Sequence, residues 1–288
     1  METKELKSLI ILLDDPDKEI FDHVAGKLLS LGTGVIPTLE TAWEESLDPV
    51  LQERIESLIN KIQFHSVEKD FETWLLNKDA TLFEGAILVA RHQYHDLDRD
   101  VTKNYLDIVR RAIWLELNHN LTPFEQINVF NHIFYGLKGY SGKQGNDANS
   151  FYLNKVIESK AGNAVSLGLM YQILAQELDI PVYGVNLPRH YVLAYCKTML
   201  TEEDLQHDQQ KNVLFYINPL SKGAIFTRNE VKAYLEKINT EESAVCFTPC
   251  SKKESIKILI EHLINAYTEE KKPHKVDELK VLLALYDK

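Results

Sequence analysis

Three residues in the second half of the chain have the order of a catalytic triad, but the first of them is an alanine. Ala164 follows a Gly-Asn pair at the start of an apolar segment, His190 opens a later apolar run, and Asn218 closes another. In cysteine–histidine enzymes a thiolate at a helix N-terminus attacks, a histidine takes the proton, and an Asp or Asn orients the histidine. The order is that of such an enzyme, but the methyl group of Ala164 cannot attack.

Neighbouring groups do not replace the missing thiol. Ser166 lies two residues further along the predicted helix, so its side chain points about 200° away around the axis. Asn163 has no nucleophilic oxygen. Cys196 follows His190 by six residues, which is about 20 Å along an extended strand and too far for direct proton transfer. The sequence therefore gives little support to thiol-acyl chemistry.

The elements that must position these residues follow from apolar patterns. Residues 163–178 are apolar around most of a helical circumference, which is typical of a buried helix. Gly168 in its middle costs roughly 1 kcal/mol relative to alanine, and a strand crossing close by would explain it. Three runs rich in β-branched and aromatic residues predict strands at 181–187, 190–196 and 212–218, and 223–227 is a further candidate. We expect an α+β fold, mainly helical, in which one central helix packs against a small antiparallel sheet.

Helical patterns flank this core. Asp15-Pro16 and Asp48-Pro49 each predict a helix start and lie 33 residues apart, a spacing that resembles HEAT-type repeats. Two ordinary helical hairpins would explain the same pattern. Thr122, with proline next and glutamate three residues on, predicts a capping box. The division expected is 1–66 HEAT-like hairpins, 67–232 core domain and 233–288 C-terminal TPR-like helices.

Composition limits the classes of function. The 288 residues are 44% hydrophobic and 26% charged with a net charge of −11, which is ordinary for a soluble globular protein and argues against a nucleic-acid binder. No apolar run is long enough for a membrane span, and the first residues do not resemble a signal peptide. Three cysteines cannot all pair and suit a reducing compartment, so we expect a cytoplasmic protein. Cys246 and Cys250 have no second pair that would favour a zinc site.

A family resemblance rests on residues 149–195, "NSFYLNKVIESKAGNAVSLGLMYQILAQELDIPVYGVNLPRHYVLAY", and on "FYINPLSKG". These segments resemble the transglutaminase-like superfamily, and more narrowly its SirB-type bacterial branch. "LFEGAILVARHQYHDLD", "FNHIFYGLKGYSG" and the helical tail "SIKILIEHLINAY" are also similar, so that the resemblance covers roughly residues 68–288. It implies a papain-like core.

The resemblance also assigns positions. Gly162-Asn163-Ala164 matches Gly-x-Cys, and Asp179-Ile180-Pro181 matches Gly-Ile-Pro. His190 matches the histidine and Asn218 the acid, so that the triad reads Ala164–His190–Asn218. A cysteine introduced at residue 164 would then lie beside His190.

Other residues have both a functional and a structural interpretation. Asn149, Tyr152, Asn163 and Arg189 are candidate binding residues, although Asn149 could instead cap a helix and Tyr152 or Arg189 could serve packing or surface roles. His190 and Asn218 could equally be a core histidine and a turn residue. Four further residues could hold a metal ion: His92, His95, Asp96 and Asp98. They lie where a helix meets a polar loop, and a solvated helix end explains them better than a metal site does.

Two functions of different classes follow. The first, which we favour, is a non-catalytic binding or scaffolding module whose partner is a protein or peptide held by helical surfaces, with no metal or cofactor. The second is a hydrolase or acyl-transfer enzyme in which His190 acts as general base on water and Asn218 holds its tautomer. The position of His190 relative to a pocket discriminates between them.

Overall fold

The computed structural model describes residues 3–207 and 209–287. They form two compact units, Met1–Leu76 and Asn77–Lys288. The helices of the first unit are α1 (Thr3–Ile11), α2 (Lys18–Ser30), α3 (Ile36–Glu45) and α4 (Pro49–Leu76). Among the described residues, no helix is both long and apolar enough to cross a membrane.

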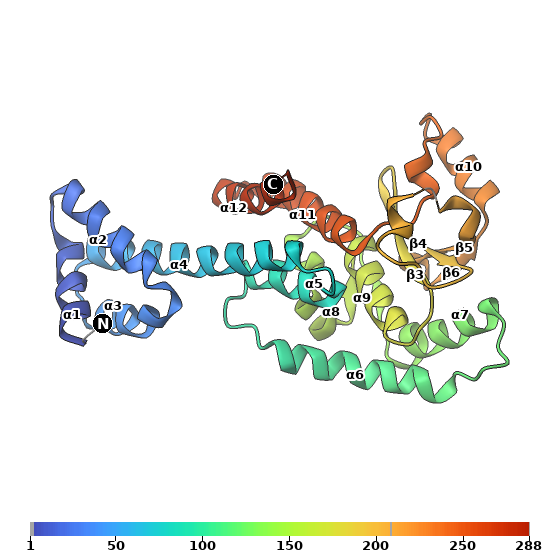
Figure 1. Cartoon of the computed structure of the whole chain (residues 1–288), viewed down its shortest axis with the longest axis horizontal. Coiled ribbons are helices and arrows are strands. Elements are labelled where there is room, and N and C mark those ends of the chain that lie inside the picture. The colour runs from blue at the N-terminus through green and yellow to red at the C-terminus, as the bar shows by residue number, and fades with distance from the viewer. Residues whose placement is uncertain (1–2, 208, 288) are drawn as a thin grey trace. The chain divides into compact units, whose positions relative to one another are not determined.

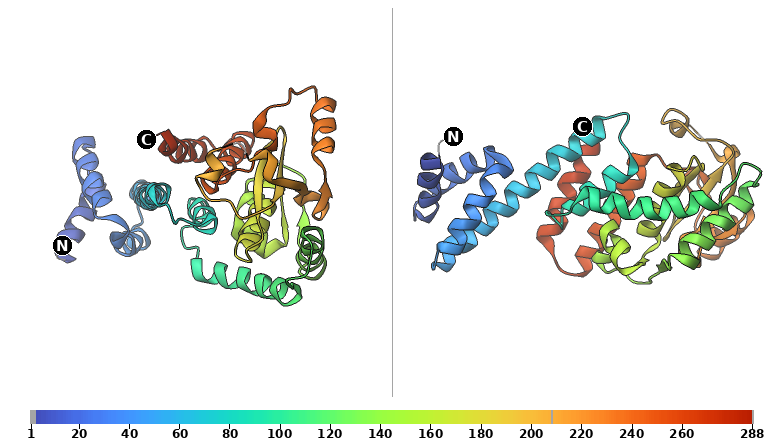
Figure 2. Two further views of the ribbon diagram at one scale, coloured as in Figure 1. Left: turned by 45° about the vertical axis from the view of Figure 1, so that its right-hand side comes forward. Right: turned by 90° about the horizontal axis from the view of Figure 1, so that it is seen from below.

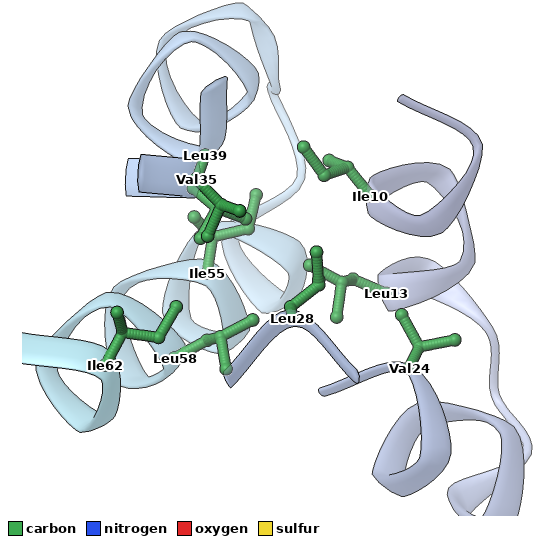
Figure 3. Packing of buried hydrophobic residues seen from close by; sticks show 9 residues of the cluster. All are labelled: Ile10, Leu13, Val24, Leu28, Val35, Leu39, Ile55, Leu58 and Ile62. Carbon is green, nitrogen blue, oxygen red and sulfur yellow. The ribbon is translucent and has the colours of Figure 1, made fainter. Parts of the chain in front are cut away.

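The first unit has its own core. Arg54 ties α4 to the 3₁₀ turn that follows α1, because its guanidinium donates to the carbonyl oxygens of Leu13 and Asp15 at 2.8 and 2.9 Å. The side chain that caps α2 is that of Asp17, two residues later than the start expected at Asp15. Figure 3 shows the buried aliphatic side chains that meet between the four helices: Ile10, Leu13, Val24, Leu28, Val35, Leu39, Ile55, Leu58 and Ile62.

The unit boundary differs from the expected division. Residues 67 and 232, at which the core domain was expected to begin and end, lie inside α4 and α10 (Arg228–Lys237). Residues 50–76 contain no proline or glycine, so nothing in the sequence breaks α4 at residue 66. The division at residue 76 follows the end of that helix. The HEAT-like and TPR-like character of the ends stays a prediction.

The second unit is mainly helical with a small sheet (Figure 1), which confirms the α+β prediction. Its helices are α5 (Leu82–Arg91), α6 (Arg99–Glu116), α7 (Pro123–Asn131), α8 (Leu153–Ser159), α9 (Ala164–Gln176), α10, α11 (Lys252–Glu269) and α12 (Pro273–Ala284). A π-helical turn, His132–Leu137, continues α7. Thr122 forms the expected capping box with Glu125. The helices α11 and α12 lie side by side (Figures 1 and 2), and α11 packs on α5 and α9.

The sheet is antiparallel, in the order β3 (Val182–Leu187), β4 (His190–Cys196), β5 (Val213–Asn218) and β6 (Ala224–Phe226). A separate parallel pair joins β1 (Ser141–Gly142) to β2 (Ala161–Gly162), directly before α9. All four strands lie at the predicted places. The polar segment between β4 and β5 contains short 3₁₀ turns.

The two faces of the sheet carry different helices. On one face Tyr191 and Leu193 of β4 pack over Gly168 of α9. On the other face Val192 and Ala194 join a core that includes Val231 and Leu235 of α10. Because side chains alternate along a strand, the odd-numbered residues of β4 point to α9 and the even-numbered residues to α10.

We expect Gly168→Ala to lower the free energy of unfolding by about 1–2 kcal/mol, because overpacking outweighs the gain in helix propensity. A Cβ there would lie 2.8 Å from ring atoms Cδ1 and Cε1 of Tyr191. Urea unfolding followed by circular dichroism measures the change. Gly26→Ala in α2, which meets no atom within 4 Å, is the control and should stabilise by about 0.5–1 kcal/mol. Equal gains at both positions would contradict the packing.

Candidate functional site

The head of α9 is tied down by hydrogen bonds rather than open for chemistry. Asn163 is the N-cap, and its Oδ1 accepts from the backbone N–H of Ser166 at 3.0 Å. The amide nitrogen of Asn163 donates to Ser150 Oγ at 3.1 Å. Ser166 Oγ donates to the carbonyl oxygen of Ser150 at 2.7 Å. These three side chains are all buried, so their polar groups satisfy one another and fasten the 147–152 segment to the helix.

Ala164 itself is partly exposed at the first position of α9. The preceding Gly162 must be glycine, because a Cβ there would lie 2.6 Å from Ser166 Oγ. Ser166 is committed to Ser150, which agrees with the sequence argument against it as a substitute nucleophile. The position that the family motif assigns to the thiol therefore presents only a methyl group.

His190 lies on the face of the sheet away from α9. It pairs with Leu187 across β3 and β4, and Leu187 belongs to the core shared with α10. The imidazole of His190 contacts the ring of Tyr234 in α10, edge to face, with centroids 5.3 Å apart. The side chain is exposed. His190 is thus not a sealed core histidine, and its ring packs on α10.

Arg189, next to His190, occupies the tight turn between β3 and β4. Its backbone has a φ of 66° and its side chain is exposed. Tyr234 braces this turn, because its hydroxyl donates to the carbonyl oxygen of Pro188 at 2.8 Å. Tyr234 therefore holds both the turn and the imidazole on the α10 side.

Asn218 is a capping residue. Its Oδ1 accepts from the backbone N–H of Leu220 at 3.0 Å and so caps a 3₁₀ turn, η7 (Pro219–Ser221). Its carbonyl oxygen accepts from Gly223. The turn η7 packs against α9 and β1. The structure thus fixes the Asn218 side chain locally, as a turn residue would be, and the imidazole of His190 is engaged elsewhere, with Tyr234.

Asn149 and Tyr152 are brought together, in a polar network that joins α5 to α11. The hydroxyl of Tyr94 donates to Asn149 Oδ1 at 2.7 Å. The ring of Tyr94 meets that of Tyr152 edge to face at 5.3 Å. The hydroxyl of Tyr152 lies 2.7 Å from that of Tyr267, and Tyr267 also donates to Gln93. Burial raises the pKa of Tyr152 and raises the pKa of Tyr267 to about 12. Both hydroxyls stay protonated, and the network is structural.

His92, near the end of α5, pairs with a carboxylate of α12. His92 is fully buried, and its Nε2 lies 2.9 Å from Glu278 Oε2 on α12. Asp98 caps α6 by accepting from two backbone N–H groups. Across residues 3–207 and 209–287, no group of three or more His, Cys, Asp or Glu side chains could hold a metal ion.

The cysteines are buried and unpaired by disulfides. Burial raises the pKa of Cys196 to about 12, and burial is also the main reason that the pKa of Cys250 rises to about 12. A thiol with so high a pKa is a thiolate only in trace amounts at neutral pH. Cys196 and Cys250 therefore do not supply the nucleophile that residue 164 lacks.

Sequence reasoning missed a cavity of about 680 Å³ at the other end of α9. It lies between the end of α6, the loop that follows α6, and the turn after α9, and its lining includes Trp114, Asp179 and Ile180. The sequence of α6 did contain an indication of this cavity. The buried face of α6 uses Leu106, Val109 and Ile113, so that Trp114 and the leucine after it are apolar residues beyond what that face needs.

The capping role of Asn163 can be tested by stability. We expect Asn163→Ala to lower the free energy of unfolding by about 1–2 kcal/mol, because it removes the cap and leaves buried partners unpaired. Asn163→Ser retains a capping oxygen and should cost less than half as much. Urea unfolding of both variants measures this. Equal losses, or no loss with alanine, would contradict the cap.

His92 should make stability depend on pH. Burial lowers its pKa from 6.5 although the hydrogen bond to Glu278 opposes the shift, and Lys275 and His274 lower it further. Because the unfolded chain takes up a proton that the folded chain resists, stability contributed by neutral His92 is lost as pH falls below about 6.5. The His92→Gln variant should lose less free energy of unfolding between pH 7.5 and 5.5 than the wild type. Parallel losses would contradict this linkage.

Comparisons with known proteins agree with this architecture. The family model described as transglutaminase-like superfamily matches residues 100–261. A UPF0162 protein of Xylella fastidiosa is 32% identical over 118 residues, which cover 39% of this chain and 41% of the relative. Protein SirB1 of Salmonella typhimurium is 27% identical over 117 residues, which cover 40% of this chain and 44% of the relative.

A more distant relative is F-box only protein 21 of Mus musculus, 26% identical over 73 residues, which cover 25% of this chain and 12% of that protein. No solved structure matches the chain. The chain spans less than half the length of the bacterial relatives it matches. The family model covers more than half of the chain, from the start of α6 into α11, and the chain therefore belongs to the transglutaminase-like superfamily.

Proposed function

We propose that the chain is a non-catalytic binding module built on a transglutaminase-like scaffold, with a protein or peptide as its partner. The observation that carries the proposal is the geometry of the triad-equivalent positions. Residue 164 presents a methyl group at the head of α9, and the imidazole of His190 contacts Tyr234 edge to face on the opposite face of the sheet. An acyl transfer through a thiol needs both groups within hydrogen-bond reach.

The alternative, a hydrolase with His190 as general base, needs a second group that orients the imidazole. Asn218 was the candidate, but its Oδ1 accepts from the backbone of Leu220. An exposed imidazole without such an orienting group gives little rate enhancement. Binding therefore accounts for the arrangement better than hydrolysis, and the helical segments at both ends offer the surfaces for a partner.

We expect no ammonia release from a blocked Gln-Gly dipeptide and no hydrolysis of p-nitrophenyl acetate above the rate of an equal number of exposed histidines in a control protein. Ala164→Cys should not create either activity, because the imidazole is on the other face of the sheet. A coupled glutamate dehydrogenase assay measures the ammonia. Turnover by the wild type that disappears in His190→Ala would overturn the non-catalytic function in favour of the general-base enzyme.

The same variant tests the geometry directly. Iodoacetamide at pH 7 should label Ala164→Cys at the same rate as the Ala164→Cys/His190→Ala double variant, since no imidazole can lower the pKa of the new thiol. The wild type, whose three cysteines are buried, gives the background. Labelling that is tenfold faster with His190 present would show the two positions to be neighbours.

A further inference from the structure

The cavity beyond the C-terminal end of α9 has the size of a ligand site. Its volume is about 680 Å³, within the range of about 300–1,000 Å³ typical of ligand pockets. Trp114 and Leu115 from α6 line it on one side, and Leu178 and Ile180 from the turn after α9 on another. The side chains of Trp114 and Leu115 are 63% and 71% exposed. A wall of this kind offers an indole face and aliphatic contacts to whatever enters.

Arg110 and Glu177 line the cavity, and their charges are balanced by each other and by the adjacent Lys103 and Asp107. Arg110 is held through its Nε by Asp107 at 3.1 Å and approaches Glu177 at 3.7 Å. Lys103 pairs with Glu177 at 2.5 Å and with Asp107 at 3.7 Å. These two cations and two anions neutralise one another. They also place positive charge beside the C-terminus of α9, where the helix dipole favours it.

Asp179 is the charge that remains. It lines the same cavity as Trp114, is exposed, and has a backbone φ of 57°, a conformation that Asp tolerates. Within the described part of the chain, no residue forms an ion pair or hydrogen bond with the carboxylate of Asp179. The cavity therefore carries one unbalanced negative charge on a chain whose net charge is −11, and both fields favour a positively charged occupant.

The cavity also offers a donor to a peptide main chain. Gln126 lines it, and its Oε1 accepts from the hydroxyl of Tyr195 at 2.7 Å. This bond fixes the amide, so that its nitrogen is the group left to donate. A carbonyl oxygen of an extended peptide is a suitable acceptor.

We propose that this cavity binds a lysine or arginine side chain of a partner peptide. The cationic head pairs with Asp179 and lies over the indole of Trp114, the best ring for a cation–π contact. The aliphatic stem lies against the leucine and isoleucine side chains, as long basic side chains readily do. This proposal rests on the proposed binding function and names the chemistry of the partner.

The test uses three blocked pentapeptides, Ac-Ala-Leu-Lys-Leu-Ala-amide and the same peptide with norleucine or glutamate in place of lysine. Titrations of the full chain are followed by the indole resonances in ¹H–¹⁵N spectra. We expect the lysine peptide to bind about tenfold more tightly than the norleucine peptide, from one ion pair and one cation–π contact. The glutamate peptide should bind more weakly than both. Added salt should weaken the lysine peptide most.

Matched variants locate the site. Trp114→Ala should weaken the lysine peptide about tenfold, whereas Tyr105→Ala, 54% exposed on the same helix but outside the cavity lining, should leave binding unchanged. Asp179→Asn should remove most of the preference for lysine over norleucine, and Asp100→Asn should not. Asn also tolerates a positive φ, so the variant is expected to fold.

Equal binding of the lysine and norleucine peptides would overturn the proposal. So would tighter binding of the glutamate peptide, which would assign the cavity to an anion through Arg110. No binding by any peptide would also overturn it, yet would leave the absence of catalysis, tested by turnover and thiol labelling, as it stands.

Discussion

The contact between Tyr191 and Gly168 sets the geometry of the whole second unit. The ring of Tyr191 lies 2.8 Å from where a Cβ of residue 168 would be, so that the ring packs directly against the backbone of α9. Once Tyr191 and Leu193 face α9, the pleat sends Val192, Ala194 and His190 to the other side. A register shift of one residue would reverse this, but it would put Val192 rather than tyrosine over Gly168 and lose the buried ring. The packing of Tyr191 on α9 thus determines on which face of the sheet the imidazole of His190 lies, and this position limits the reactions in which it can take part.

The polar groups near the head of α9 also serve the fold rather than a reaction. An enzyme of this layout would leave a side chain at the helix head free to react. Here Asn163 and Ser166 are used to bind the 147–152 segment, and Asn218 is used to cap η7. Each amide or hydroxyl satisfies a backbone group that would otherwise be buried without a partner, which is worth about 1–3 kcal/mol. The residues that remain from the family pattern stabilise the fold.

Local patterns in the sequence were sufficient for the elements and for some caps. The four strands, the buried helix with its glycine, and the capping box at Thr122 all depend on residues close to one another in the chain. The face occupied by His190 could not be predicted, because it depends on which of two alternating sets on β4 meets a helix that is distant in sequence. The partners of Asn149 and Tyr152 were equally hidden, since Tyr94 and Tyr267 are more than 50 residues away on either side.

The two ends of α9 differ in a way that explains where binding would occur. At the N-terminal end Asn163 caps the helix with a neutral amide, and the polar side chains there bond to one another. At the C-terminal end Lys103 and Arg110 compensate the dipole and are themselves neutralised by Asp107 and Glu177. What is left there is one carboxylate, Asp179, beside an exposed indole. Recognition needs an unbalanced group next to apolar surface, and the C-terminal end of α9 combines the two.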